Sequence, residues 1–203
     1  MFKVKNLLRH AVLALALVGS PFAAIAAPVS FHVDLNTSTL SGPGYIDLQF
    51  GALTSAPLTT VTFSNFMGAF GAVDFSDGDV VVNADGSYTL GNLPDIGSLL
   101  SFNALFGAHL GFDLAFSDDH ASATGTDGST LTIALLDSAF TAIGGAYGVA
   151  QFDLTPGSGV NSSVNASFAS IGPVVNAVPE PSDLVMMLTG LALLGFTLRR
   201  RAQ

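Results

Sequence analysis

The sequence predicts an all-β protein, a single antiparallel β-sandwich with a jelly-roll-like arrangement, flanked by an N-terminal secretory signal and a C-terminal apolar helix. Two observations predict the sandwich. Apolar and polar residues alternate with a period of two in six runs of the chain, and Gly- and Asp-rich turn sequences separate these runs. Many short strands between frequent turns are typical of two packed antiparallel sheets.

Each alternating run is a predicted strand with one buried face. Their inward residues are Phe31, Val33 and Leu35; Ile46, Leu48 and Phe50; Val61 and Phe63; Leu110, Phe112, Leu114 and Phe116; Leu131, Ile133 and Leu135; and Ala150, Phe152 and Leu154. The segment Val80–Leu90 predicts a hairpin that turns at Ala84–Gly86. We expect a short helix over Ile96–Phe106 and a last strand over Val164–Phe168.

The predicted sandwich body, residues 27–170, has an unusual charge composition. All six basic residues of the 203-residue chain lie in the two end segments, and all fifteen acidic residues lie within Ala27–Leu198. This acidity excludes nucleic acid as a partner, because binding to phosphates requires Lys or Arg. It suits cations, neutral polymers or bulk solvent instead. The chain contains no Cys, so no disulfide helps to stabilise the body.

Residues 1–26 resemble a secretory signal peptide. Lys3, Lys5 and Arg9 precede an apolar stretch, and small residues follow it. Ala24-Ile25-Ala26 matches the A-x-A cleavage pattern, which places the cut between Ala26 and Ala27. The pattern implies export by the Sec machinery. An uncleaved membrane anchor is the alternative, although the apolar stretch is short for one.

The other end of the chain comprises a linker at 171–183, an apolar segment at 184–198 and a basic tail at 199–203. Leu184–Leu198 contains no charge over fifteen residues. As a helix it would span about 22 Å, against about 30 Å for the apolar core of a bilayer. Arg199, Arg200 and Arg201 would keep the C-terminus in the cytoplasm. The segment therefore suits a transient transmembrane anchor better than a permanent one.

A short proline motif precedes this apolar segment. Pro179 and Pro181 hold an extended backbone on both sides of Glu180, which is the only glutamate in the chain. An extended segment with one acid suits recognition by a membrane protease. A linker turn is the alternative for this motif taken alone.

The order Pro179-Glu180-Pro181, apolar helix and Arg cluster resembles the PEP-CTERM sorting signal of Gram-negative bacteria. The resemblance covers about Val178–Ala202 together with the signal peptide. It implies cleavage near the motif by an exosortase, a membrane-embedded processing enzyme. It also implies an association with exopolysaccharide and biofilm. It implies nothing about what the body binds.

The body contains no catalytic motif that we recognise, and we expect a protein that is not an enzyme. His32, His109 and His120 are widely spaced, so we expect them to face solvent or to be satisfied by neighbours. A hydrolase that uses two Asp carboxylates is an alternative hypothesis, but the sequence suggests no pair of carboxylates and no substrate for it.

Two acidic clusters are candidate calcium sites. One comprises Asp74, Asp77 and Asp79, and the other Asp118–His120 with Asp127. Solvated turns are the alternative for both clusters, because Asp favours turns. Apart from Ca²⁺, no cofactor is expected.

Aromatic residues bear on two further expectations. The chain has no Trp and only three Tyr, which argues against a strong sugar-stacking site but permits weak contact with a polymer. The Phe-rich segment Thr62–Gly71 belongs either to the core or to a partly exposed apolar ridge.

The sequence therefore predicts an exported protein that is anchored transiently in the inner membrane and then delivered to the cell surface or extracellular matrix. Its expected role is structural or adhesive. The alternative is a secreted β-sandwich module that binds calcium or a polysaccharide.

Overall fold

The computed structural model describes residues 28–94 and 96–174. The predicted signal segment 1–26, the cut between Ala26 and Ala27, and the motif Pro179–Pro181 lie outside the described residues, as do Leu184–Leu198 and Arg199–Arg201. Within the described ranges the chain contains strands, turns and loops but no α-helix, and therefore no helix that could cross a membrane.

Thirteen β-strands make up the described part of the chain. They are β1 Val29–Asn36, β2 Gly42–Ala52, β3 Thr60–Met67, β4 Phe70–Asp77, β5 Val80–Val82, β6 Tyr88–Gly91, β7 Ser98–Phe106, β8 His109–Phe116, β9 Ser129–Asp137, β10 Ala142–Ile143, β11 Ala150–Thr155, β12 Gly159–Val164 and β13 Ala169–Pro173.

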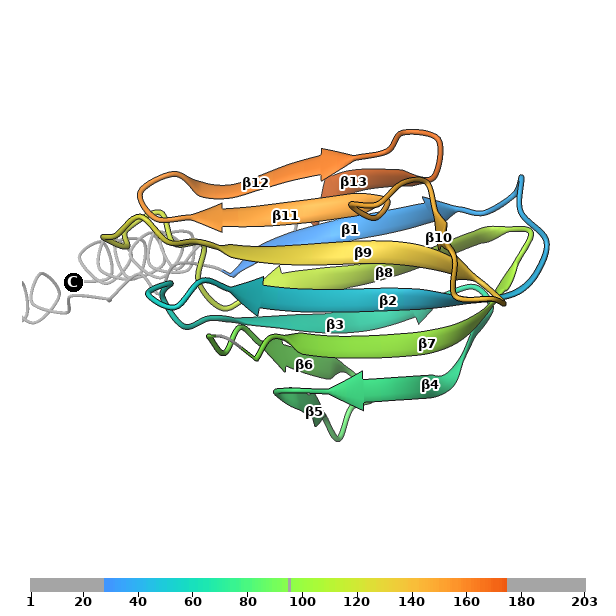
Figure 1. The fold of residues 1–203 in the computed structure, drawn as a ribbon, viewed down its shortest axis with the longest axis horizontal. Helices are drawn as coiled ribbons and strands as arrows, with labels where there is room; N and C mark the ends of the chain where they lie inside the picture. Colours follow the sequence, from blue (N-terminus) through green and yellow to red (C-terminus); the bar gives the residue numbers. More distant parts are fainter. Residues whose placement is uncertain (1–27, 95, 175–203) are drawn as a thin grey trace, which may run out of the picture.

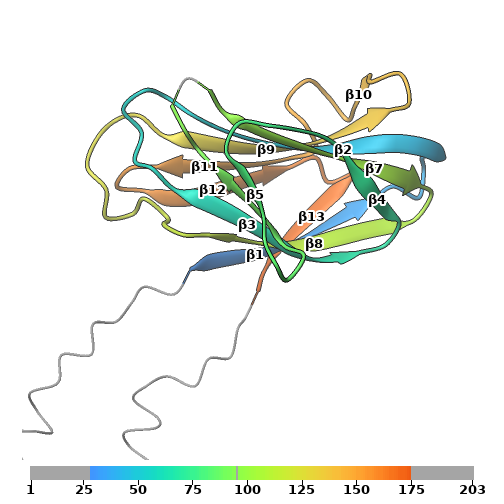
Figure 2. The ribbon, with the colours of Figure 1, turned by 90° about the horizontal axis from the view of Figure 1, so that it is seen from below.

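The strands form two antiparallel sheets that lie one behind the other, so the fold is β-sandwich-like (Figures 1 and 2). The six-stranded sheet, here called sheet A, has the order β13-β1-β8-β3-β6-β5. The other, sheet B, has the order β12-β11-β9-β2-β7-β4, with β10 paired to β9. All strand pairs are antiparallel, and consecutive strands repeatedly change sheet, as β1, β2, β3 and β4 do.

The core lies between the two sheets and is built from the inward residues of both. In strands such as β9 the buried residues alternate with partly exposed ones, and Leu131, Ile133 and Leu135 are fully buried. This is the arrangement that a period of two produces when one face of a strand is covered. The core therefore forms one apolar layer that extends across both sheets.

Aromatic rings make many of the contacts between the sheets. Phe116 of β8 in sheet A lies 5.8 Å from Phe152 of β11 and 6.1 Å from Phe50 of β2, measured between ring centroids. A second group is centred on Phe66 and Phe102, whose ring centroids are 5.2 Å apart. Such tilted and edge-on pairs add to the free energy gained from burying the rings.

The structure confirms the six predicted strands, which correspond to β1, β2, β3, β8, β9 and β11. Of their predicted inward residues only Phe31 is partly exposed. It also confirms the hairpin, because β5 and β6 pair antiparallel, with Val82 opposite Tyr88 across the turn. In the segment Thr62–Gly71 the phenylalanines belong to the core, since Phe63 is buried and Phe66 and Phe70 pack against the core, while Met67 is 52% exposed.

Two predicted elements are wrong. Ile96–Phe106 is not a helix, because Ser98–Phe106 forms β7 in the interior of sheet B, between β2 and β4. Val164–Phe168 is not a strand, because Asn165 begins a turn: its backbone carbonyl accepts the N–H of Phe168, and its side chain accepts that of Ser167. Asn favours such turns since its side chain competes for backbone donors.

The two ends of the described chain lie side by side. β13 pairs antiparallel with β1, so Pro173 lies opposite Phe31, and the N–H of Val174 donates to the carbonyl of Ser30 at 3.1 Å. This pairing continues to Pro173, beyond the boundary at 170 that the sequence predicted for the body. Both chain ends therefore leave the body from the same place (Figure 2).

We predict that Phe116→Ala lowers the free energy of unfolding by about 3–5 kcal/mol, because it leaves a cavity where rings from both sheets meet. Urea unfolding followed by far-ultraviolet circular dichroism measures the change. Phe75→Ala is the matched control, since Phe75 lies on the edge strand β4 and is 52% exposed. Equal losses for the two variants would contradict a core centred between the sheets.

Candidate functional site

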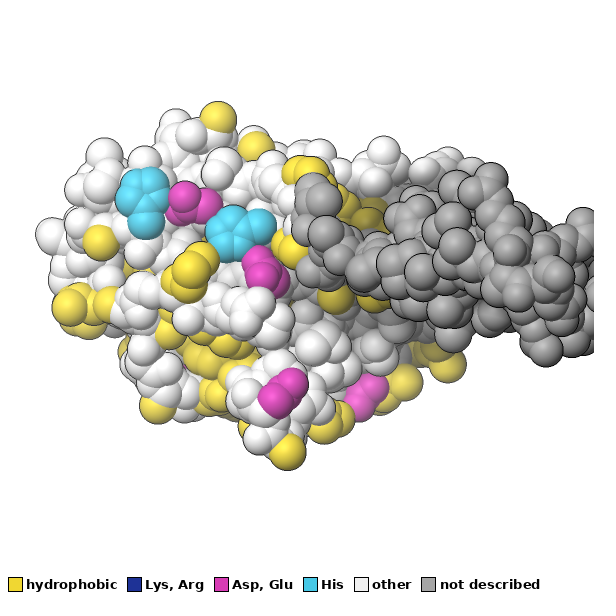
Figure 3. Space-filling view, turned by 180° about the vertical axis from the view of Figure 1, so that it is seen from behind, with side chains coloured by type: hydrophobic (Ala, Val, Ile, Leu, Met, Phe, Trp, Pro, Cys, Tyr) yellow, Lys and Arg dark blue, Asp and Glu magenta, His cyan; other side chains and the backbone are white. Residues whose placement is uncertain are grey.

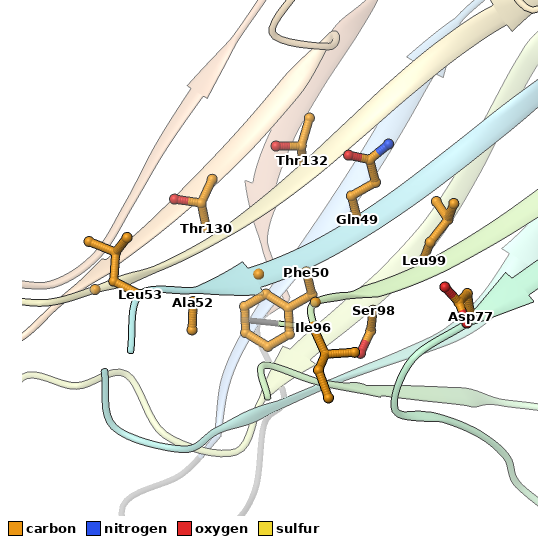
Figure 4. Close-up of a pocket in the computed structure, with 13 residues that line it drawn as sticks. Gln49, Phe50, Ala52, Leu53, Asp77, Ile96, Ser98, Leu99, Thr130 and Thr132 are labelled. Carbon is orange, nitrogen blue, oxygen red and sulfur yellow. The ribbon is translucent and has the colours of Figure 1, made fainter. Parts of the chain in front are cut away.

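The outer face of sheet B carries a groove of about 560 Å³ that is open to solvent. Strands β2, β7 and β9 form its floor, and the loops that follow β2 and precede β7 form one end (Figure 4). Gln49, Thr130 and Thr132 contribute amide and hydroxyl groups, while Leu53 and Ile96 contribute apolar surface. A volume of this size is within the range of small-ligand sites.

Gly51 leaves the floor of the groove open. It lies in β2 opposite Thr130 of β9, and a Cβ atom added there would meet no other atom within 4 Å. A larger residue at this position would therefore extend into the groove without striking the fold.

Hydrogen bonds hold the polar residues beside the groove in fixed positions. Asp153 accepts hydrogen bonds from Thr130 Oγ1 at 2.8 Å and from Gln151 Nε2 at 2.8 Å. Asp47 accepts one from Ser101 Oγ at 2.6 Å. Neutral hydroxyl and amide groups thus satisfy carboxylates that have no Lys or Arg available in the body.

Partial burial raises the pKa of the Asp47 carboxyl above its ordinary value. The hydrogen bond from Ser101 opposes the rise, and the nearby Asp74 carboxylate adds to it. Ionised Asp47 is therefore a cost to the folded state at neutral pH.

An aromatic pair lies on the same face of β2 as the groove, beyond Asp47. Tyr45 stacks on Phe140 with ring centroids 4.4 Å apart and an angle of 16° between the rings. Phe140 is 60% exposed, so the stacked pair offers a flat aromatic surface to solvent. Tyr45 and Gln49 share a face because alternate residues of a strand point the same way.

The structure places the first predicted calcium cluster on β4 and the turn after it. Asp74 accepts a hydrogen bond from Asn103 Nδ2 at 3.3 Å, whereas Asp77 lines the groove. The Asp79 carboxylate lies against Gly91 of β6. Among the described residues no three acidic or His side chains come close enough to hold a metal ion, so these three carboxylates do not converge.

The second acidic cluster lies in the loop between β8 and β9. Asp118 accepts the N–H of His120, and Asp119 accepts the N–H of Ala121. Asp127 accepts the N–H of Ser55 from the loop after β2. Asp118 and Asp119 therefore stabilise turns, as the alternative interpretation of this cluster expected, whereas Asp127 ties two loops together.

His120 is fully buried in this loop, and neither of its ring nitrogens has a hydrogen-bond partner. Its backbone has a φ of 61°, and its carbonyl accepts the N–H groups of Ala123 and Gly157. The expectation of a solvent-facing or satisfied side chain is therefore wrong for His120. The hydrogen bonds that its backbone carbonyl accepts close the loop around His120, and the imidazole is buried beneath it.

His32 and His109 lie on the outer face of sheet A, each beside an Asp. His32 Nδ1 is 2.6 Å from Asp113 Oδ1, and His109 Nδ1 is 2.8 Å from Asp34 Oδ1. Figure 3 shows the imidazole and carboxylate groups side by side on this face. Both histidines are satisfied by neighbours, as the sequence predicted.

A β-bulge in β3 brings a third residue to one of these pairs. The register of β3 against β8 shifts between Ser64 and Met67, and Asn65 there has a φ of 52°. Its side chain donates to Asp113 Oδ2 at 2.7 Å. Desolvation raises the pKa of Asp113, but the hydrogen bonds from Asn65 and His32 and the charge of His32 outweigh it and lower the pKa.

Neither the groove nor the Asp–His pairs could be predicted from the sequence. The pairs join residues of β1 and β8 that lie about 80 positions apart, His32 and Asp113 being separated by 81. The one available signal was the alternation itself, which assigns His32, Asp34 and Asp113 to outward positions.

Comparison with known proteins gives no relative for this chain. No family model matches it, and neither the curated proteins nor the solved structures contain a significant match.

We predict that Asp47→Asn raises the melting temperature by a few degrees at pH 7. A carboxyl whose pKa is raised in the folded state loses stability as the pH rises through that pKa, and Asn removes the buried charge while still accepting the Ser101 hydrogen bond. The difference should vanish below the ordinary Asp pKa of about 3.9. Thermal unfolding by circular dichroism at several pH values measures it.

Asp113→Asn is the control, and it should change the melting temperature in the opposite direction. The lowered pKa of Asp113 contributes stability that is present above the ordinary Asp pKa and is lost as the pH falls through the folded value. This variant should therefore melt below the wild type at pH 7. A decrease for both variants would contradict a desolvation cost at Asp47.

Proposed function

We propose that this chain is an exported, C-terminally sorted protein of the cell surface or extracellular matrix, with a structural or adhesive role and no enzymatic activity. The observation that carries the proposal is the position of the chain ends. All described strands lie within Val29–Pro173, and both ends of this range leave from one place, β1 beside β13. Removal of both terminal segments would leave every described strand intact.

The proposed route follows from the two end segments. The Sec machinery exports the chain, and cleavage between Ala26 and Ala27 removes the signal. Leu184–Leu198 then holds the chain in the inner membrane, with Arg199–Arg201 on the cytoplasmic side. An exosortase-type enzyme cuts near Pro179–Pro181 and releases the body to an exopolysaccharide matrix or biofilm. The body itself, with twelve described Asp and no Lys or Arg, stays soluble through its charge.

The strand order supports a jelly-roll-like description of the body. β8 lies between β1 and β3 in sheet A, while β7 lies between β2 and β4 in sheet B. The pair β7 and β8 is thus inserted between the pair β1 and β2 and the pair β3 and β4, as in the wrapped hairpins of a jelly roll. β9, β11, β12 and β13 extend both sheets beyond this unit.

We predict that protein recovered from the medium of the native host has lost both Met1–Ala26 and the segment Leu184–Arg201. Intact-mass measurement of the membrane and medium fractions tests this. Replacement of Pro179, Glu180 and Pro181 by Ala should leave the full-length tail on protein that stays in the membrane. A retained tail on wild-type protein at the cell surface would overturn the sorting proposal.

The groove favours a second candidate function, a secreted module that binds a neutral polysaccharide. One amide, several hydroxyls and one carboxylate line the groove, and these groups hydrogen-bond with sugar hydroxyls. The stacked Tyr45 and Phe140 supply an aromatic surface on the same face. The calcium form of this candidate depends on Asp74, Asp77 and Asp79, which do not converge.

We predict for this candidate that Gly51→Leu reduces binding of the host's own neutral polymer at least tenfold, because the new side chain occupies the floor of the groove. Gly172→Leu is the matched control, since Gly172 lies in β13 of the other sheet and also has nothing within 4 Å of an added Cβ. Isothermal titration or a thermal-melt shift measures binding. Equal effects of the two variants would remove the groove as the site.

A further inference from the structure

Four aliphatic side chains protrude from two loops at one end of the body. Leu53 and Leu58, in the loop between β2 and β3, are 63% and 67% exposed. Leu93 and Ile96, in the loop between β6 and β7, are 37% and 71% exposed. We call these four residues the apolar tips. Exposed apolar residues are ordinary on a folded domain, and the other end of the body exposes Phe140 and Tyr147 as well, so the case for the apolar tips depends on their position relative to the chain ends.

Asn92 joins the two loops into one unit. Its side chain accepts the N–H of Thr59 at 2.7 Å and donates to the carbonyl of Pro57 at 2.8 Å and to Ser129 Oγ at 2.6 Å. Asn92 is only 1% exposed, and every polar atom of its amide is used. A buried and fully satisfied amide of this kind fixes the loops, so the tips are held in place.

The apolar tips lie at the end of the body from which the chain leaves. The start of β1 and the start of β3 both lie opposite the end of β8, because Val29 and Val61 each align with Phe116. The loops that carry the tips connect to β3 and to the end of β6 at this same end (Figures 1 and 2). Val174, from which residues 175–203 continue, is hydrogen-bonded to Ser30 there.

We propose that the apolar tips rest on the surface of a neutral lipid bilayer while the chain is anchored. This inference rests on the proposed function, in which Leu184–Leu198 inserts into the membrane. Residues 175–183 between Val174 and that segment span at most about 30 Å when extended. The anchor thus keeps the tips near the bilayer, and a weak contact becomes significant because it is intramolecular.

The charges near the tips select the kind of lipid. The body has no Lys or Arg, and the neighbouring loop between β8 and β9 carries Asp118, Asp119 and Asp127. Anionic headgroups would repel these carboxylates, whereas zwitterionic phospholipid would not. The partner is therefore a neutral bilayer surface.

Contact at this end would orient the body for processing. It holds Val174 beside the membrane, so the segment that contains Pro179–Pro181 stays within reach of a membrane-embedded protease. Once the tail is cut, the tips alone bind too weakly to retain the body, because the effective concentration that the anchor supplied is lost.

Single tryptophans in the full chain test this inference, because the wild-type sequence contains no Trp. Leu58→Trp and Ile96→Trp place the probe at the tips, and Phe140→Trp places it in the turn between β9 and β10, at the other end of β9. Each variant is reconstituted into phosphatidylcholine vesicles whose acyl chains carry bromine. The two tip probes should lose about half of their emission, since they reach the boundary between headgroups and acyl chains, and Phe140→Trp should lose none.

The outcomes separate the two proposals. Quenching of both tip probes, reduced when half of the lipid is phosphatidylglycerol, supports the inference. Chains that float with the vesicles but show no tip quenching overturn it and leave the membrane anchor standing. Equal quenching of all three probes also overturns it, because the body would then have no preferred orientation. Chains that do not float with the vesicles overturn the anchor and with it the inference.

Discussion

The packing of sheet A against sheet B is the interaction on which the rest of the structure depends. The chain has no Cys and the body no Lys or Arg, so neither disulfides nor bridges from carboxylate to Lys or Arg contribute to its stability. What remains is an apolar layer in which rings such as Phe116 and Phe152 bridge the two sheets. Burial of such side chains is the dominant favourable term in folding, and in this body neither disulfides nor salt bridges to Lys or Arg add to it.

The same composition determines how the acidic residues are used. Without basic partners, carboxylates accept hydrogen bonds from backbone N–H groups in turns or from neutral side chains. Asp137 caps the turn after β9 in this way, and Asp85 caps the turn between β5 and β6. Hydrogen bonds lower the pKa of Asp85 below its ordinary value, first of all that from the Ser87 hydroxyl. Only His32 and His109 offer the described carboxylates a partner that can become cationic.

The sequence predicts strands well where one face is buried and the other is polar, because burial then imposes a readable period of two. Alternation does not reveal β7, because its outward positions include Leu99 and Leu105, which make the strand resemble a continuous apolar run. Alternation does not reveal β4 for the opposite reason, because β4 is a mostly exposed edge strand with two register shifts. The groove could not be predicted because it depends on the neighbours β9, β2 and β7, an order set by tertiary packing.

The groove and the apolar tips share two side chains, which links the two proposed roles of the body. Leu53 and Ile96 line one end of the groove and also protrude where the chain leaves the body. A bilayer in contact with the tips and a polymer in that end of the groove would therefore compete for the same surface. Under the proposed function, cleavage near Pro179–Pro181 would remove the anchor and with it the advantage of the bilayer in this competition. Processing at the tail would in this way make the groove available only after the body has left the membrane.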